Sequence, residues 1–208
     1  MARPAAPPQT GATGLTLQQT AKVGERAWDK SEKVSGELFA LTYGTMVSNL
    51  VEEQAAASPA ATVADRLAKV NVQLEGIGVR IGQRMIDEFL AKSGAPPCKS
   101  FLSTSETIAK IGLKMFLNVS AQVDSVVTAE DSQAYSLLFE ENPLNGYAEL
   151  PDGAVKQHLW YSNVLCGVIR GALEQVGIKT KCVFVRDTLR GDPVNEIRVT
   201  RVAPPKAK

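Results

Sequence analysis

The residues that could carry out chemistry are few in this chain, and their spacing favours no enzyme class. There is a single histidine, His158, so metal sites built on histidine pairs are excluded and a Ser-His-Asp triad would have to use this residue. No GxSxG turn accompanies it, and neither a P-loop pattern nor GxGxxG follows a predicted strand. At the start of a predicted helix, a histidine is more often a surface or capping residue. We therefore expect no catalytic residue, no metal site and no bound cofactor.

Cys98 is the exception among the reactive side chains. The three cysteines, Cys98, Cys166 and Cys182, form an odd set without a CxxC pair, which argues against a disulfide framework and a zinc site. Cys98 lies in the proline-rich SGAPPCKS turn, precedes the cationic Lys99 and comes just before a predicted helix, and both features favour thiolate over thiol. A modifiable sulfur and an inert loop residue remain the two interpretations. Cys166 and Cys182 are expected to be buried as small hydrophobes.

The other polar groups indicate surface and turns. The RGD tripeptide at residues 190–192 belongs to a turn-forming segment, LRGDP. The neighbouring acids Glu140 and Glu141, like Asp87 and Glu88, face different directions on regular structure, so they predict a solvated surface.

Composition excludes several broad classes of protein. The 208 residues include 23 basic and 22 acidic side chains, and no run of Lys or Arg with interleaved aromatics indicates nucleic-acid binding. Apolar runs fall short of the roughly 20 residues of a membrane span, and the N-terminus has no secretory h-region, so we expect a cytoplasmic protein. One domain is predicted over residues 23–202, with a disordered N-terminal tail over 1–22 and a frayed C-terminal tail over 203–208.

Hydrophobic periodicity predicts an α+β fold. Helical spacing predicts helices after Ser35, over residues 63–90, and after a cap at Ser103 or Thr104, followed by a long apolar helix that begins near Gln157. Alternating residues predict one pair of strands between 122 and 150 and a second pair around LRGDP. We therefore expect helices packed on a roughly four-stranded antiparallel sheet.

Two pairs of glycines lie inside these predicted helices. Gly78 and Gly82 are four residues apart in one helix, and Gly167 and Gly171 repeat the spacing in the long apolar helix. Glycine costs about 1 kcal/mol against alanine in a helix interior, so each pair predicts a stripe that another backbone approaches closely. A partner subunit and an ordinary buried core helix are both consistent with this pattern.

The sequence resembles the trafficking protein particle complex subunit 3 family, a small core subunit of the TRAPP vesicle-tethering complex. The resemblance covers most of residues 24–200 and is carried, in family order, by GERAWDKSEKVSGELFALTYG, IGVRIGQRMIDEFLAKSGAPPCKSF, IAKIGLKMFLNVS, YSLLFEENPLNGYAELP, HLWYSNVLCGVIRGALEQV and FVRDTLRGDPVNEIRV. It implies a non-catalytic subunit that forms a helix-mediated homodimer or heterodimer with other small TRAPP subunits. The implied complex acts in transport from the endoplasmic reticulum to the Golgi and is a guanine-nucleotide exchange factor for a Rab-type GTPase. The implied location is peripheral, at the cis-Golgi and endoplasmic reticulum.

The same resemblance implies S-acylation. The family's modified cysteine corresponds to Cys98, and its covalent palmitate is expected inside a hydrophobic tunnel of the subunit. This chain departs from the family pattern at Pro97, where a basic residue is usual, and at Val126, where tryptophan is common. A different interpretation is a lipid or acyl-binding module, in which the tunnel is the main function and assembly is secondary.

Overall fold

The computed structural model describes residues 15–129 and 132–202. Its helical elements are α1 (Leu17–Lys30), α2 (Gly36–Ala57), α3 (Val63–Lys92), α4 (Phe101–Thr107), the π-helix η1 (Ile108–Gly112), α5 (Leu113–Leu117), α6 (Ala154–His158), α7 (Val164–Gln175) and the 3-10 turn η2 (Thr188–Arg190). Its strands are β1 (Gln122–Ala129), β2 (Ser132–Phe139), β3 (Thr180–Arg186) and β4 (Asn195–Arg201). Across the described residues, no helix is both long enough and apolar enough to span a bilayer.

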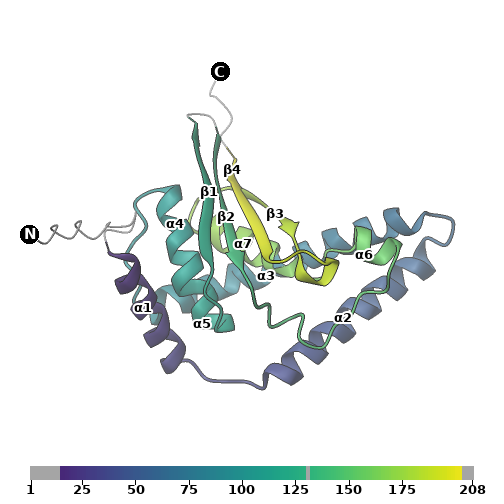
Figure 1. Ribbon diagram of the computed structural model, residues 1–208, viewed down its shortest axis with the longest axis horizontal. Helices are drawn as coiled ribbons and strands as arrows, with labels where there is room; N and C mark the ends of the chain where they lie inside the picture. The colour runs from purple at the N-terminus through teal and green to yellow at the C-terminus, as the bar shows by residue number, and fades with distance from the viewer. Residues whose placement is uncertain (1–14, 130–131, 203–208) are drawn as a thin grey trace, which may run out of the picture.

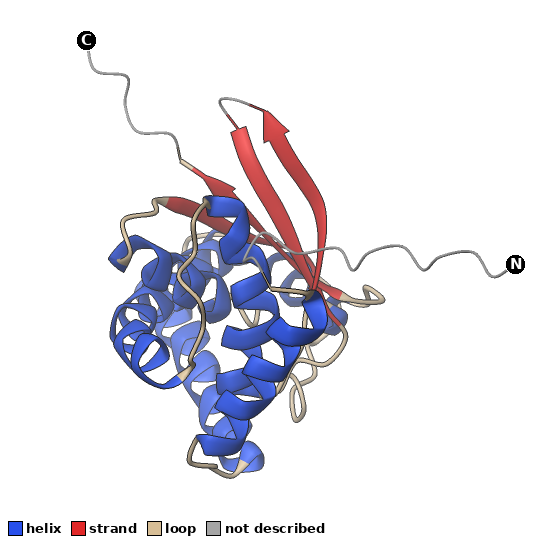
Figure 2. Ribbon diagram, turned by 90° about the vertical axis from the view of Figure 1, so that its left-hand side faces the viewer, coloured by secondary structure: helices blue, strands red, loops and turns tan. Residues whose placement is uncertain are grey.

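The four strands form one antiparallel sheet in the order β1-β2-β4-β3, with the helices gathered on one side of it (Figures 1 and 2). The side chains of Tyr135, Leu137 and Phe139 alternate along β2 and are buried, as a strand with one face toward the helices requires. The predicted α+β class with an antiparallel sheet is confirmed.

Helix starts follow the side chains that cap them. Ser35 accepts a hydrogen bond from the backbone N–H of Leu38 at the start of α2, as predicted. The predicted cap at Ser103 or Thr104 is wrong, because Ser100 caps α4 and Ser103 completes a reciprocal capping box with it. The helix therefore begins within three residues of Cys98.

The predicted N-terminal boundary also needs correction. Helix α1 begins at Leu17, so residues 17–22 belong to a helix and not to a tail. Thr16 and Gln19 form a capping box there, and Gly24 packs against the backbone carbonyl of Lys110 in η1. Residues 1–14 and 203–208, the rest of the predicted tails, lie outside the described residues.

The long helix predicted from Gln157 is two helices, α6 and α7, separated by residues 159–163. Asn71 of α3 holds this break, because its side chain donates to the carbonyl oxygen of His158 (2.8 Å) and accepts from the N–H of Trp160 (2.9 Å). Its own carbonyl accepts from the side chain of Asn163 (2.8 Å). The backbone groups released by the break are thus paired through one residue of another helix.

The glycine stripes of α3 and α7 face each other. A Cβ on Gly167 would lie 2.1 Å from the carbonyl oxygen of Glu75 and 2.8 Å from the Cα of Gly78. One on Gly171 would lie 2.2 Å from the carbonyl oxygen of Val79, while one on Gly82 would meet the α7 backbone at 2.1 Å. The predicted close approach is confirmed, and it occurs within one chain: α7 is a core helix, not a docking helix.

Candidate functional site

Cys98 lies in the connection between α3 and α4. Cys98 is exposed, and its Sγ lies 3.3 Å from the Oγ1 of Thr107, close enough for the thiol to donate to the hydroxyl oxygen. Thr107 itself donates to the carbonyl oxygen of Ser103, so its position is fixed by α4. The predicted placement of Cys98 just before a helix is confirmed, and the residue is exposed to solvent.

The other two thiols lie in different surroundings. Cys166 on α7 and Cys182 on β3 are both buried, as predicted. Burial raises the pKa of Cys182 to about 12, and it raises the pKa of Cys166 strongly as well. Because the thiolate is the nucleophile, Cys98 is the thiol best placed for covalent modification.

Aromatic and hydroxyl groups lie behind Cys98. The hydroxyls of Thr104 and Tyr135 are 2.9 Å apart, and the rings of Tyr135 and Phe101 have centroids 4.9 Å apart. Burial raises the pKa of Tyr135 well above its usual value, so this hydroxyl stays protonated. These contacts connect α4 to the sheet next to the exposed sulfur.

Two grooves on the described surface lie away from Cys98. One follows α2 and is lined by Thr42, Thr45, Met46, Asn49, Leu50 and Glu53, and the other lies beside residues 118–122 and 138–141. Cys98 lines neither of them. The acyl tunnel expected from the family resemblance stays a prediction.

Helix α2 presents a broad apolar surface to solvent. Only Ala40, Tyr43 and Val47 of its 22 residues are buried. Leu38 and Leu41, one turn apart, are 67% and 55% exposed, whereas Met46 and Leu50 further along the helix are partly buried against the core and line the groove. Large apolar side chains exposed side by side are typical of a protein interface. For this reason we define the α2 face as the surface made by Leu38 and Leu41.

A buried polar cluster joins the loops at one end of the sheet. Asp187 is buried and accepts from the N–H of Leu189 (3.0 Å), while Asn145 donates to Asp187 and to Thr188. Asn195 accepts from Thr188 and donates to the carbonyl oxygens that end β2. The cluster closes the loop after β2 onto the β3–β4 connection.

Asp187 carries the least satisfied atom of this cluster. Within the described residues, its Oδ2 is a buried oxygen without a hydrogen-bond partner. Burial raises the pKa of the Asp187 carboxyl, because the charged form loses hydration that the cluster replaces only in part. This points to a structural role for the group.

The RGD tripeptide is used inside the protein. The guanidinium of Arg190 lies 3.9 Å from the ring centroid of Trp160 and donates to the carbonyl oxygen of Gln157. Asp192 accepts from the N–H of Asp187 (2.8 Å). The turn predicted for this tripeptide is confirmed, and its two charged side chains stabilise the loops around it.

The single histidine lies on the surface of the protein. His158 is exposed at the end of α6, and its carbonyl oxygen is the group that bonds to Asn71. Among residues 15–129 and 132–202, no three His, Cys, Asp or Glu side chains gather where they could hold a metal ion.

Comparison with known proteins gives one consistent match. Residues 39–200 match the family described as transport protein particle (TRAPP) component. The Schizosaccharomyces pombe transport protein particle subunit bet3 is 46% identical over 178 residues, which is 86% of this chain and 90% of that protein. The Dictyostelium discoideum trafficking protein particle complex subunit 3 is 45% identical over 178 residues, 86% of this chain and 89% of that protein.

A solved structure agrees with these sequence matches. The crystal structure of a trafficking protein particle complex subunit 3 from Naegleria fowleri, described as covalently bound to palmitic acid, superposes with a TM-score of 0.72 and 41% identity. The superposition covers 83% of this chain and 98% of that one.

Proposed function

Because this chain belongs to the TRAPP component family, we propose that it is a core subunit of the TRAPP vesicle-tethering complex in transport from the endoplasmic reticulum to the Golgi. Its role is non-catalytic: it supports assembly of the guanine-nucleotide exchange factor for a Rab-type GTPase. The match over nearly the whole length of subunit 3 relatives is the observation that carries this proposal. Nucleotide exchange makes no covalent bond, since the factor remodels the switch loops of the GTPase until nucleotide leaves.

The α2 face is the surface that we assign to neighbouring small subunits, in a homodimer or a heterodimer. Leu38 and Leu41 are solvated in the described chain, and burial against another subunit is worth about 25 cal/mol for each Å² of apolar surface. The glycine stripe of α7 is already occupied by α3, so it offers no comparable surface.

Affinity purification tests both statements. Tagged chain from its source cells should bring down the other small TRAPP subunits, and the purified assembly should accelerate release of labelled nucleotide from a Rab-type GTPase. Leu41→Glu should abolish the association, because it places a charge on the apolar α2 face. Val72→Glu on α3 is the matched control, since Val72 is exposed outside the α2 face. Equal recovery of partners with both variants would remove α2 from the interface.

We also propose S-acylation of Cys98 by palmitate. The Sγ attacks the carbonyl carbon of an acyl-coenzyme A: the new thioester forms as the donor's thioester breaks, and the thiol proton leaves with coenzyme A. The support is the exposure of Cys98, the burial of the two other cysteines and the palmitic acid of the Naegleria fowleri relative. At about 0.8 kcal/mol per buried CH₂, a palmitoyl chain contributes about 12 kcal/mol of transfer free energy in a protein interior or a bilayer.

An acyl chain inside the protein acts as core and not as a membrane anchor. Cys98→Ser should lose the hydroxylamine-sensitive mass seen by intact mass spectrometry, melt at a lower temperature and keep its oligomeric state. Acylated wild type that partitions into liposomes far better than Cys98→Ser would contradict the internal placement. Retention of the labile mass by Cys98→Ser would contradict the site.

The second candidate function is an acyl-binding module whose lipid pocket is its main activity. The palmitic acid in the solved relative is the observation that favours it. A carrier should purify from cells without other TRAPP subunits, so the affinity purification separates the two functions.

A further inference from the structure

The sheet turns one face away from the helices, toward the viewer of Figure 1. Ser136, Arg198 and Val183 are directly opposite one another on β2, β4 and β3, so their side chains share this outer face. Their neighbours Val199 and Cys182 point to the buried side. Val183 is 38% exposed.

A β-bulge in β3 adds a second arginine to this face. The register shifts between Phe184 and Arg186, so that Phe184 is opposite Ile197 and Arg186 is opposite Glu196. The extra residue, Val185, is also exposed. Bulges redirect side chains in this way, and here the bulge places Arg186 beside Glu196 on the outer face.

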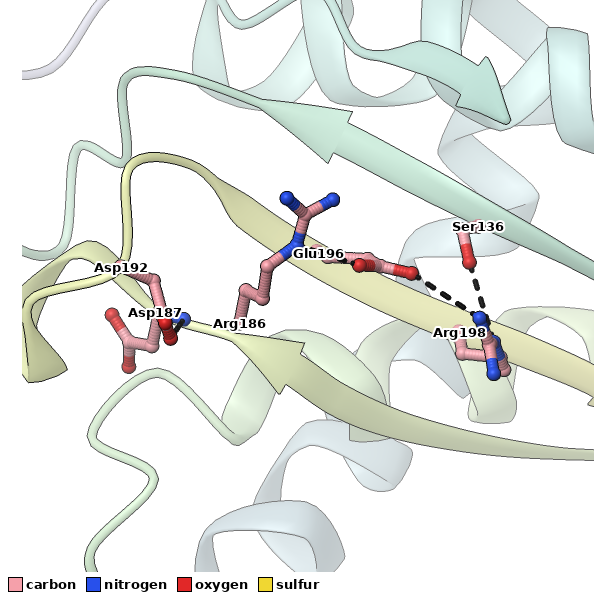
Figure 3. A network of polar contacts seen from close by, with 6 residues as sticks. All are labelled: Ser136, Arg186, Asp187, Asp192, Glu196 and Arg198. Atoms are coloured by element: carbon pink, nitrogen blue, oxygen red, sulfur yellow. Dashed lines mark hydrogen bonds and ion pairs between the residues drawn. The ribbon is translucent and has the colours of Figure 1, made fainter. Parts of the chain in front are cut away.

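Glu196 holds the two arginines in fixed positions. The Nε of Arg186 lies 2.8 Å from its Oε2, and a terminal nitrogen of Arg198 lies 3.5 Å from its Oε1, as Figure 3 shows. The Glu196 side chain is only 7% exposed, whereas the side chains of Arg186 and Arg198 are 37% and 46% exposed. The Nε of Arg198 also donates to Ser136 (3.4 Å). The terminal nitrogens of Arg186 point away from Glu196 in Figure 3, so their N–H donors are not used by this ion pair.

The β3–β4 half of the outer face therefore has a net positive charge. Lys181 is exposed opposite Thr200 and joins the two arginines, against the single carboxylate of Glu196. The exposed carboxylate of Asp124 lies on the far strand β1. We name the surface of Lys181, Val183, Val185, Arg186 and Arg198 the outer sheet face.

We propose that the outer sheet face docks a carboxylate-rich segment of a partner protein, as an interface separate from the α2 face. Guanidiniums bind carboxylates through paired, charge-assisted hydrogen bonds, and those of Arg186 and Arg198 are already positioned by Glu196. Arginine is enriched at protein interfaces relative to the rest of the protein surface. A polybasic membrane surface would instead cluster about four to eight Lys or Arg.

A pair of substitutions of opposite charge at Val183 tests the proposal without breaking an ion pair. A photoreactive benzoylphenylalanine at Val183 of the full chain, irradiated in the source cells, should form an adduct with a segment of another protein rich in Asp and Glu. The synthetic peptide of that segment is then titrated against the purified chain. Val183→Glu should weaken binding by about tenfold or more, whereas Val183→Lys should not weaken it. Arg80→Glu, an exposed charge reversal on α3, is the control and should leave binding unchanged.

Several outcomes would overturn this assignment. In the cross-linking experiment, these are an adduct on a second copy of the chain, on a lipid, or on a segment without an excess of acidic residues. In the titration, it is an equal loss of affinity in Val183→Glu and Val183→Lys. The absence of an adduct at Val183, when the same photoreactive residue at Leu41 gives one, would overturn it as well. Melting curves of the two Val183 variants establish that both are folded.

Discussion

The crossing of α3 and α7 gives the sharpest test of how this chain folds. In Gly78→Ala, the new methyl carbon would lie 2.0 Å from the carbonyl oxygen of Val164 and 2.9 Å from the Cα of Gly167. Carbon and carbonyl oxygen normally approach to about 3.3 Å, so the helices must separate by roughly 1.3 Å. Both obstacles are backbone atoms, which cannot rotate away as a side chain would. Overpacking of this kind costs about 1 to 3 kcal/mol.

The matched control lies two residues away on the same helix. A Cβ on Gly76 meets nothing within 4 Å. Gly76→Ala therefore gains the helix propensity of alanine, about 1 kcal/mol, without a steric cost. Gly78→Ala gains the same propensity but loses the close contact, so we expect a net loss of up to about 2 kcal/mol. The two variants should differ by the overpacking cost alone, about 1 to 3 kcal/mol.

Urea unfolding at one fixed protein concentration measures this difference, because subunit association would otherwise alter the apparent stability. The double variant Gly78→Ala/Gly167→Ala should lose less than the sum of the single losses, since the first methyl already separates the helices. If Gly78→Ala is as stable as Gly76→Ala, the close crossing does not exist as described.

Three further predictions address the loops and α1. Asp187→Asn should become more stable relative to wild type as pH rises from about 4 toward 7. Burial raises the pKa of the Asp187 carboxyl in the folded state above its value in the unfolded state. The protonated carboxyl therefore stabilises folded wild type below the unfolded-state pKa, and this stabilisation is lost as pH rises through the folded-state pKa. Unfolding at both pH values checks this, and a pH-independent difference would refute it. Asn71→Ala should lose roughly 1 to 3 kcal/mol in urea unfolding, because the N–H of Trp160 loses its acceptor; an unchanged midpoint would mean that water replaces the side chain. Gly24→Ala should separate α1 from the carbonyl oxygen of Lys110 and so speed tryptic cleavage within α1. Gly36→Ala is the control, because a Cβ there meets nothing within 4 Å, and it should not speed cleavage. Equal cleavage rates in the two variants would mean that α1 does not pack against Lys110.

Local signals were sufficient for most of the fold. The cap at Ser35 and the alternation through Tyr135, Leu137 and Phe139 each depend on residues close in sequence, and the structure follows them. The break between α6 and α7 could not be found in this way. It depends on a hydrogen bond from the N–H of Trp160 to the side chain of Asn71, which is 89 residues away in the sequence. The hydrophobic pattern of the residues around the break stays helical and apolar.

For the candidate site as well, local sequence predicted some features and missed others. The position of Cys98 in a turn before a helix follows from prolines and polar caps, so sequence located it correctly. The helix that packs on the glycine stripe of α7 could not be predicted from the sequence. The spacing of the glycines shows that another backbone approaches closely, but it does not show which backbone. The bulge that brings Arg186 to Glu196 was missed for a related reason, since it is visible only once the register of β3 against β4 is known.

Several of the segments that carry the family resemblance contribute contacts internal to the fold. ENPL contributes Asn142, which donates to Ser162 of the YSNVLCGV segment, and RGDP contributes the side chains that stabilise the β3–β4 loop. Exposed residues such as Leu41 and Val183 make no such contacts and can change without loss of the fold. Identity to relatives therefore gives strong evidence for the architecture and weaker evidence for partner choice. If partner choice depends on these exposed faces, Leu41→Glu and Val183→Glu should each remove a different set of associated proteins while leaving the unfolding free energy within about 0.5 kcal/mol of wild type at a concentration where the chain is monomeric.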